Sequence, residues 1–297
     1  MIDINRLKIF TISENSAADM GFLGEWGLSI LIDLDGLRIL FDTGMGRSIL
    51  PNLELFEMDL LTIDKVILSH GHADHTGGLI PVLQQINSKQ PQKKVEVIAH
   101  PDIFAGKYYQ RSPEETPFYQ GVPFSIEEVE KLGGVLKLFS QPFWINDHLV
   151  ISGQVPMSND FETVSDGCLL KINETIIKDP LADDMALYIK TNLGLVVISG
   201  CAHRGIINTI HHGQKITGME RVYMVIGGTH LANASDYQLS ATIAELKRLN
   251  ISKLGASHCT GMASACRLGS ELGHNFFHNN AGTNITFVDN EMQVKAF

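Results

Sequence analysis

The residues best suited to metal binding or catalysis lie in one short segment, Ser69-His70-Gly71-His72-Ala73-Asp74-His75-Thr76-Gly77-Gly78. It places three imidazoles and a carboxylate directly after an apolar stretch, and these groups are ligands of zinc, manganese and iron(II). His70 and His72 can point the same way in extended backbone, whereas Asp74 and His75 point toward a neighbouring position. The spacing therefore predicts metal ligands here, with room for two ions.

A metal site of this kind needs further ligands from elsewhere in the chain. The second half offers three histidines that each follow an apolar, strand-like segment: His203, His230 and His258. In the segment Ile226-Gly227-Gly228-Thr229-His230, the histidine has three open functional roles. It is expected to bind substrate, to shuttle a proton, or to replace a missing ligand, and a purely structural histidine is the alternative.

The elements that must position these residues are short and punctuated by glycine and aspartate. Asp35-Gly36 predicts a hairpin turn between two Ile- and Leu-rich strands. The pattern after it reads as strand, loop, helix, strand, and helices are predicted near residues 76–88, 204–212, 235–249 and 262–271. Two strand-rich halves interrupted by helices predict a layered α/β fold rather than an all-β barrel.

One segment breaks this regular pattern. Residues 101–134 mix aromatic side chains with prolines and charges and are interpreted as an inserted lid. Because the chain shows no fixed repeat and no Ser- or Pro-rich linker, we expect residues 1–297 to form a single domain that carries this lid.

The composition of the chain argues against several classes of function. The chain has 297 residues, of which 44% are hydrophobic, and its formal net charge is −10 at pH 7. It lacks a basic cluster for nucleic acid and an apolar run for a membrane span, and its four cysteines have no zinc-ribbon spacing. We therefore expect a cytoplasmic protein with reduced thiols, a small-molecule partner, no nucleic-acid or membrane partner, and room for an oligomer.

Several of these motifs resemble the metallo-β-lactamase superfamily. They are Phe41-Asp42-Thr43-Gly44, the HGHADHTGGL segment, Gly200-Cys201-Ala202-His203-Arg204-Gly205-Ile206 and the turn His258-Cys259-Thr260-Gly261. Together they resemble the branch named for 7,8-dihydropterin-6-methyl-4-(β-D-ribofuranosyl)aminobenzene-5′-phosphate synthase. The resemblance implies a four-layer αββα sandwich with a dinuclear metal site at one edge.

The resemblance also implies a ligand set for two divalent ions, with zinc expected first and manganese or iron also suited. The implied ligands are His70, His72 and His203 for one ion, and Asp74, His75 and His258 for the other.

Other residues take supporting roles in this comparison. Asp42 is expected to hold the metal-binding loop through hydrogen bonds behind the ligands. Cys201 stands where the superfamily usually supplies a bridging aspartate, so it is either a weak ligand or a packed thiol. Asp74 is a candidate to orient the attacking group, and His230 and Arg204 are candidates to stabilise charge.

The leading functional hypothesis is a hydrolase in which a metal-activated hydroxide attacks a phosphoester or carbonyl centre. The substrate is expected to be phosphorylated or heteroaromatic, and the aromatic lid could stack on a flat ring such as a pterin. The alternatives are a transferase that joins a dihydropterin pyrophosphate to an aminobenzene ribofuranosyl phosphate, electron transfer or oxygen chemistry, and a non-catalytic, metal-stabilised binding protein.

Overall fold

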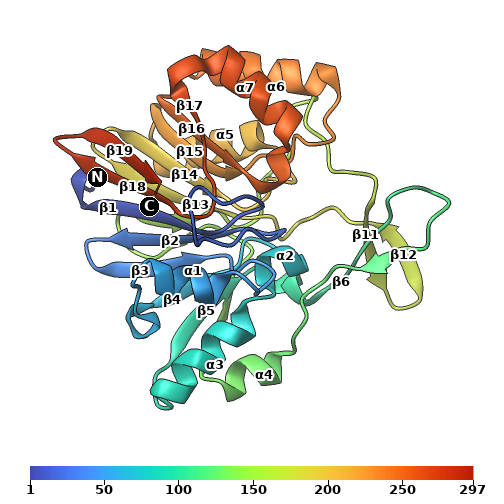
Figure 1. Ribbon diagram of the computed structural model, residues 1–297. Coiled ribbons are helices and arrows are strands. Elements are labelled where there is room, and N and C mark those ends of the chain that lie inside the picture. The colour runs from blue at the N-terminus through green and yellow to red at the C-terminus, as the bar shows by residue number, and fades with distance from the viewer. Residues whose placement is uncertain (297) are drawn as a thin grey trace.

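The computed structural model describes residues 1–296, and within them two large β-sheets pack face to face (Figure 1). The first sheet runs in the order β19 (Glu291–Ala296), β18 (Thr283–Val288), β1 (Leu7–Ser13), β2 (Ser29–Leu34), β3 (Leu37–Phe41), β4 (Lys65–Ile67), β5 (Val95–Ala99) and β8 (Gly134–Leu138). The second runs in the order β17 (Phe276–His278), β16 (Lys253–Ser257), β15 (Val222–Gly228), β14 (Gly194–Ser199), β13 (Ala186–Thr191), β10 (Leu149–Ile151) and β9 (Phe143–Trp144).

Helices cover the outer face of each sheet, as Figure 1 shows. The first sheet carries α1 (Ile49–Leu55), α3 (Leu79–Lys89) and α4 (Ile126–Lys131), and the second carries α5 (Ile206–Thr217), α6 (Asp236–Arg248) and α7 (Met262–Leu272). The predicted four-layer αββα sandwich is confirmed. No helix within residues 1–296 has both the length and the apolar character needed to cross a membrane.

Three apolar cores hold these layers together. One lies between the two sheets and includes Ile9, Ile30, Ile198 and Ile226, and the others lie between each sheet and its helices. Every residue of β14 and of β15 is buried, because these parallel strands are covered on both faces. This explains why their sequences are continuous apolar runs rather than alternating ones.

The local predictions agree well with these elements. The turn at Asp35-Gly36 joins β2 to β3, with Leu34 opposite Leu37. The helices α5, α6 and α7 begin within two residues of the predicted starts, and α5 continues beyond its predicted end to Thr217. Ser235 caps α6 by accepting a hydrogen bond from the backbone N–H of Gln238.

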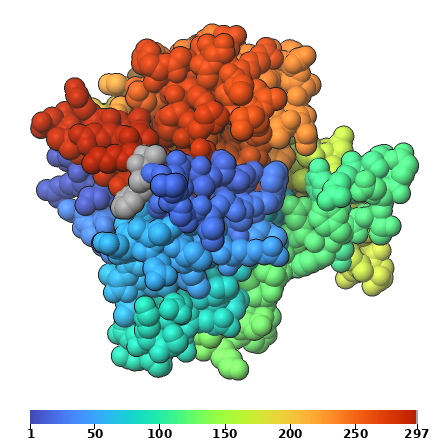
Figure 2. Space-filling view, viewed as in Figure 1, coloured from blue at the N-terminus to red at the C-terminus, as the bar shows by residue number. Residues whose placement is uncertain are grey.

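A smaller sheet projects from the sandwich, in the order β12 (Thr175–Lys178), β11 (Cys168–Ile172), β6 (Gly106–Tyr109) and β7 (Phe118–Tyr119). We call these four strands the small sheet. In the space-filling view its two chain segments form one protrusion (Figure 2). The segment 101–134, interpreted above as a lid, supplies β6 and β7, but it ends in α4, whose Val129 packs in the core beneath the first sheet. The other half of the small sheet comes from residues 168–178.

Candidate metal centre

The candidate ligands, and Asp42 behind them, follow strands that run parallel and end at the same edge of the sandwich. Asp42 follows β3, the histidine loop (residues 69–76) follows β4, His203 follows β14, and His258 follows β16. Because the carboxyl ends of parallel strands meet at one edge, residues far apart in the sequence converge there. The short helix α2 (Ala73–Thr76) forms the end of the histidine loop.

The backbone at this edge is unusual at four positions. Asp42, Ala202, His230 and His258 have φ values of 58°, 54°, 52° and 52°, in the left-handed region. Such conformations are uncommon for residues other than glycine and tend to gather at functional sites. Here each one turns the chain sharply just after a strand of the sandwich.

The first group of ring nitrogens consists of His70, His72 and His203, all buried. Nε2 of His70 lies 3.0 Å from Nδ1 of His72 and 3.2 Å from Nε2 of His203. Three nitrogens that share one tetrahedral zinc ion at about 2.1 Å are separated by about 3.4 Å, so these spacings suit a shared cation.

The second group consists of Asp74, His75 and His258. Nε2 of His258 lies 3.2 Å from Nε2 of His75 and 3.3 Å from Oδ2 of Asp74. Cys201 Sγ is 3.1 Å from Nε2 of His75 and also groups with His70, so the thiol lies between the two sets of ligand atoms.

A buried carboxylate behind the groups sets the orientation of two imidazoles. Asp42 accepts hydrogen bonds from the backbone N–H and the hydroxyl of Ser69 and from Nδ1 of His75, each at 2.7 Å. The Ser69 hydroxyl in turn lies 2.9 Å from Nδ1 of His70. This network assigns a proton to Nδ1 of both histidines, so Nε2 is the ring nitrogen that faces the cluster.

Two further supports were not expected from the sequence. Nδ1 of His258 lies 2.9 Å from Oδ1 of Asn15, and Asp183 accepts a hydrogen bond of 2.8 Å from the backbone N–H of Gly71. Gly71 has to be glycine, because a Cβ there would lie 2.3 Å from the carbonyl oxygen of Ile103. Asn15 and Asp183 follow no motif, so nothing in the local sequence connects them to the histidine loop.

Burial keeps the first group neutral. It holds the pKa of His70 and of His203 well below the ordinary value and brings the pKa of His72 to about 3. Three uncharged imidazoles therefore place ring nitrogens 3.0–3.2 Å apart, an arrangement that a shared cation would suit.

The second group is charged. Burial opposes protonation of His75, but Asp42 and Asp74 outweigh that effect and raise its pKa to about 9. Burial would also raise the pKa of Asp74, yet His75 and His258 hold it below its ordinary value. Oδ1 of Asp74 is buried and has no hydrogen-bond partner among residues 1–296. An ionised carboxylate with a free buried oxygen beside imidazoles fits a divalent cation.

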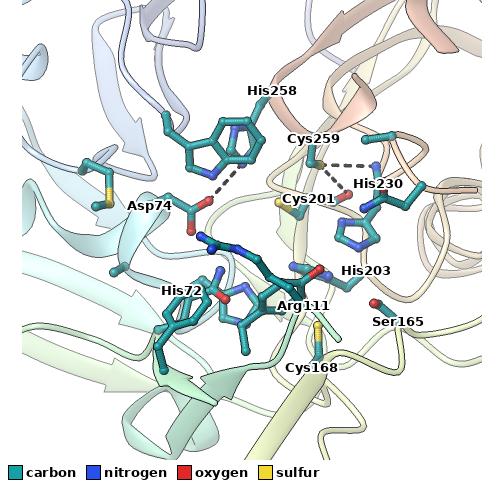
Figure 3. Close-up of a pocket in the computed structure, with 18 of the residues that line it drawn as sticks. His72, Asp74, Arg111, Ser165, Cys168, Cys201, His203, His230, His258 and Cys259 are labelled. Atoms are coloured by element: carbon teal, nitrogen blue, oxygen red, sulfur yellow. Dashed lines mark hydrogen bonds and ion pairs between the residues drawn. The ribbon is translucent and has the colours of Figure 1, made fainter. Parts of the chain in front are cut away.

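A cavity of about 720 Å³ opens over both groups. Its lining includes Asp74, His203 and His230, and Figure 3 shows these side chains with Arg111 among them. Aromatic side chains complete the lining: Trp26 from the first half of the sandwich, and Tyr109, Phe118 and Tyr119 from the small sheet.

The two residues expected to stabilise charge have different surroundings. His230 lines the cavity, with its ring centroid 4.1 Å from that of His203, and its Nδ1 has no partner within the described chain. Arg204 does not line the cavity, because its guanidinium donates to the backbone carbonyls of Val155 and Pro180. The arginine that reaches the cavity is Arg111, which follows no motif and was missed.

Known proteins resemble this chain over most of its length. The 7,8-dihydropterin-6-methyl-4-(β-D-ribofuranosyl)-aminobenzene-5′-phosphate synthase of Methanocaldococcus jannaschii is 34% identical over 293 residues, which cover 96% of this chain and 98% of that protein. An uncharacterized protein of the same organism is 33% identical over 264 residues, which cover 88% of this chain and 93% of that protein.

A solved structure and a family model point to the same superfamily. The crystal structure of a metal-dependent hydrolase of the β-lactamase superfamily has a TM-score of 0.79 and 25% identity, and the match covers 95% of this chain and 100% of that chain. The family model described as the metallo-beta-lactamase superfamily matches residues 27–143. From its αββα sandwich and these similarities, the chain belongs to the metallo-β-lactamase superfamily.

Proposed function

We propose that this protein is a hydrolase that holds two divalent metal ions and cleaves a phosphoester or carbonyl bond in a small, pterin-related molecule. The observation that carries the proposal is the pair of adjacent ligand groups at the base of one cavity. Zinc suits the mixed imidazole and carboxylate donors, and manganese or iron suits them as well. When bound, the ions would supply Lewis acidity to a water molecule and to a substrate oxygen.

The side chains around the ions divide the remaining work. Asp74 Oδ1 is free to accept a hydrogen bond from an attacking water and so to orient it. His230 lies on the cavity side of His203, where its ring can deliver a proton to a leaving group. Cys201 would serve as a ligand shared by the two groups, a role supported by the proximity of its thiol to His70 and His75.

Replacement of His72 by alanine tests the metal assignment. His72→Ala should lose at least one metal equivalent, and its kcat/KM for bis(4-nitrophenyl) phosphate should fall by more than the ~100-fold that loss of an outer hydrogen-bond partner costs. Metal content is measured by elemental analysis of purified protein. His274→Ala removes an exposed imidazole and is the matched control. Full turnover with both metals retained in His72→Ala would refute the proposal.

Transfer is the second candidate, and the synthase relative at 34% identity favours it. In that reaction the site would activate a dihydropterin pyrophosphate, and an aminobenzene ribofuranosyl phosphate would displace the pyrophosphate. A cavity of about 720 Å³ with aromatic side chains on two sides can hold more than one ring.

The two candidates are separated by supplying the dihydropterin pyrophosphate with and without the aminobenzene acceptor. A hydrolase releases pyrophosphate at the same rate in both mixtures, whereas a transferase releases it only when the acceptor is present. Product is identified by mass spectrometry.

A further inference from the structure

Arg111 stands apart from the other charged residues of the cavity. It follows β6 in the loop that leads to β7, and it is the only lysine or arginine among the cavity-lining residues of the described chain. In Figure 3 its side chain extends across the cavity toward the side where Asp74 lies. A positive charge in this position is notable because the whole chain carries a formal net charge of −10.

Among residues 1–296, no carboxylate forms an ion pair with the guanidinium of Arg111. Instead the guanidinium lies over the ring of Phe118, whose centroid is 5.3 Å from Cζ. Lys107, on the preceding strand β6, makes two ion pairs of 2.8 Å, so an unpaired cation is not a general property of the small sheet. A planar guanidinium with free N–H groups is well suited to bind a carboxylate or phosphate through two hydrogen bonds.

Aromatic rings flank this guanidinium. Tyr109 packs edge-on against Phe118 with 5.9 Å between ring centroids, and both line the cavity. On the sandwich side, Trp26 contacts the ring of His258 at 5.2 Å and is 61% exposed, so one indole face remains open. Flat ligands bind between such faces through stacking and apolar contact.

We propose that Arg111 binds a negatively charged group carried by a flat aromatic ring, and that this ring lies between Trp26 and the small sheet. The small sheet is then the element that selects the substrate, while the histidine groups act on it. The inference rests on the proposed function only in taking this cavity as the substrate site, because the anion and the ring are recognised by side chains outside the metal ligands.

Tryptophan fluorescence can report binding in this cavity directly. The chain has two tryptophans, so Trp144→Phe leaves Trp26 as the single indole. Pterins absorb where tryptophan emits, and a bound pterin should therefore quench Trp26. The probes are pterin-6-carboxylate and neutral 6-hydroxymethylpterin, with phenylphosphonate as a competitor that distinguishes phosphate-like from carboxylate groups.

In this background, Arg111→Gln should weaken pterin-6-carboxylate binding by about 10-fold or more, since hydrogen bonds to charged groups are the stronger kind. The Kd of the neutral pterin should change by less than about 2-fold. Arg111→Lys keeps the charge but loses the bidentate geometry. Its Kd for pterin-6-carboxylate should therefore lie between those of the protein with Arg111 intact and of Arg111→Gln. If phenylphosphonate displaces the neutral pterin only when Arg111 is intact, the group bound is phosphate-like.

Lys178→Gln is the matched control, because it removes one charge from the same sheet at a position outside the cavity lining. Equal Kd values for Arg111→Gln and Lys178→Gln overturn the inference, as does wild-type protein that binds the anionic pterin no more tightly than the neutral one. A different pair of results would contradict only the proposed function. In that case Arg111→Gln loses anion binding, as inferred here, while His72→Ala keeps its metals and its activity.

Discussion

At the scale of single residues, Asp42 has the widest influence on the candidate metal centre. It is fully buried and accepts three hydrogen bonds, and one of them fixes Nδ1 of His75 as the protonated nitrogen. Its φ of 58° is tolerated by aspartate and asparagine better than by most residues. The side chain therefore has two roles: aspartate tolerates the left-handed backbone at this position, and its carboxylate accepts the hydrogen bond from His75.

Asp42→Asn separates the backbone role of this residue from its role as a hydrogen-bond acceptor. The amide keeps an acceptor for Ser69 and suits the left-handed backbone, but its NH₂ group faces Nδ1 of His75 and favours the ring proton on Nε2. We expect a folded protein whose affinity for zinc falls by about 10- to 100-fold. Zinc affinity is measured by competition with a chromophoric chelator, and Asp35→Asn, at an exposed turn, should leave it unchanged.

The sequence shows these ligands more clearly than their supports. His70, His72, Asp74 and His75 are visible because they crowd one loop after a strand, and the structure brings His203 and His258 to the same place, as the resemblance implied. That they bind metal remains a prediction. Asn15, Asp183 and Arg111 reach the site from segments without a pattern, and only the folded chain shows where such side chains point.

At the scale of elements, a buried ion pair links the small sheet to the histidine loop. Lys107 on β6 is 1% exposed and donates to Asp179 and Asp183, and the second oxygen of Asp183 holds the backbone N–H of Gly71. Burial alone would lower the pKa of Lys107, but the two carboxylates outweigh it and raise that pKa. The cavity's aromatic strand is thus fixed relative to the candidate ligands.

Lys107→Met should reveal the strength of this link. The substitution leaves two buried carboxylates without their cation, and such losses cost about 3–5 kcal/mol of unfolding free energy. Urea titration measures the change, and Lys178→Met, which removes a solvent-exposed ion pair, should cost less than about 1 kcal/mol. Adding Asp179→Asn to Lys107→Met should recover part of the loss, and no recovery would contradict this account.

The main elements were predictable because their patterns are local, whereas the small sheet was not. The apolar runs of β14 and β15 and the cap at Ser235 identify strands and a helix directly. The pairing of β11 with β6 joins residues about 60 positions apart, Cys168 opposite Tyr109, and no local signal records it. The local sequence of residues 168–172 consequently does not distinguish this strand from the strands of the sandwich.

At the scale of the whole molecule, the candidate ligands come from both halves of the sandwich. The histidine loop follows a strand of the first sheet, and His203 and His258 follow strands of the second. An ion held by both therefore connects the two sheets at their open edge. A ligand that binds only the folded state stabilises it in proportion to the logarithm of its free concentration.

Metal removal should therefore lower the thermal stability of the entire chain in one transition. At a free zinc concentration about 1,000 times Kd, the gain is about 4 kcal/mol per site. Differential scanning calorimetry of chelator-treated and zinc-reloaded protein measures the shift in Tm. His258→Ala should show a smaller shift than wild type, whereas His274→Ala should show the full one. Equal Tm values with and without zinc would contradict a cation that connects the sheets.

The small sheet is assembled from two stretches of chain, residues 106–119 and 168–178, that are separated by strands of both large sheets. The small sheet therefore cannot be exchanged between related proteins as one continuous segment of sequence. A chimera that exchanges only the first stretch would leave β11 facing a mismatched neighbour along four paired positions. Changes in ligand preference across such proteins should accordingly require coordinated alterations in both stretches.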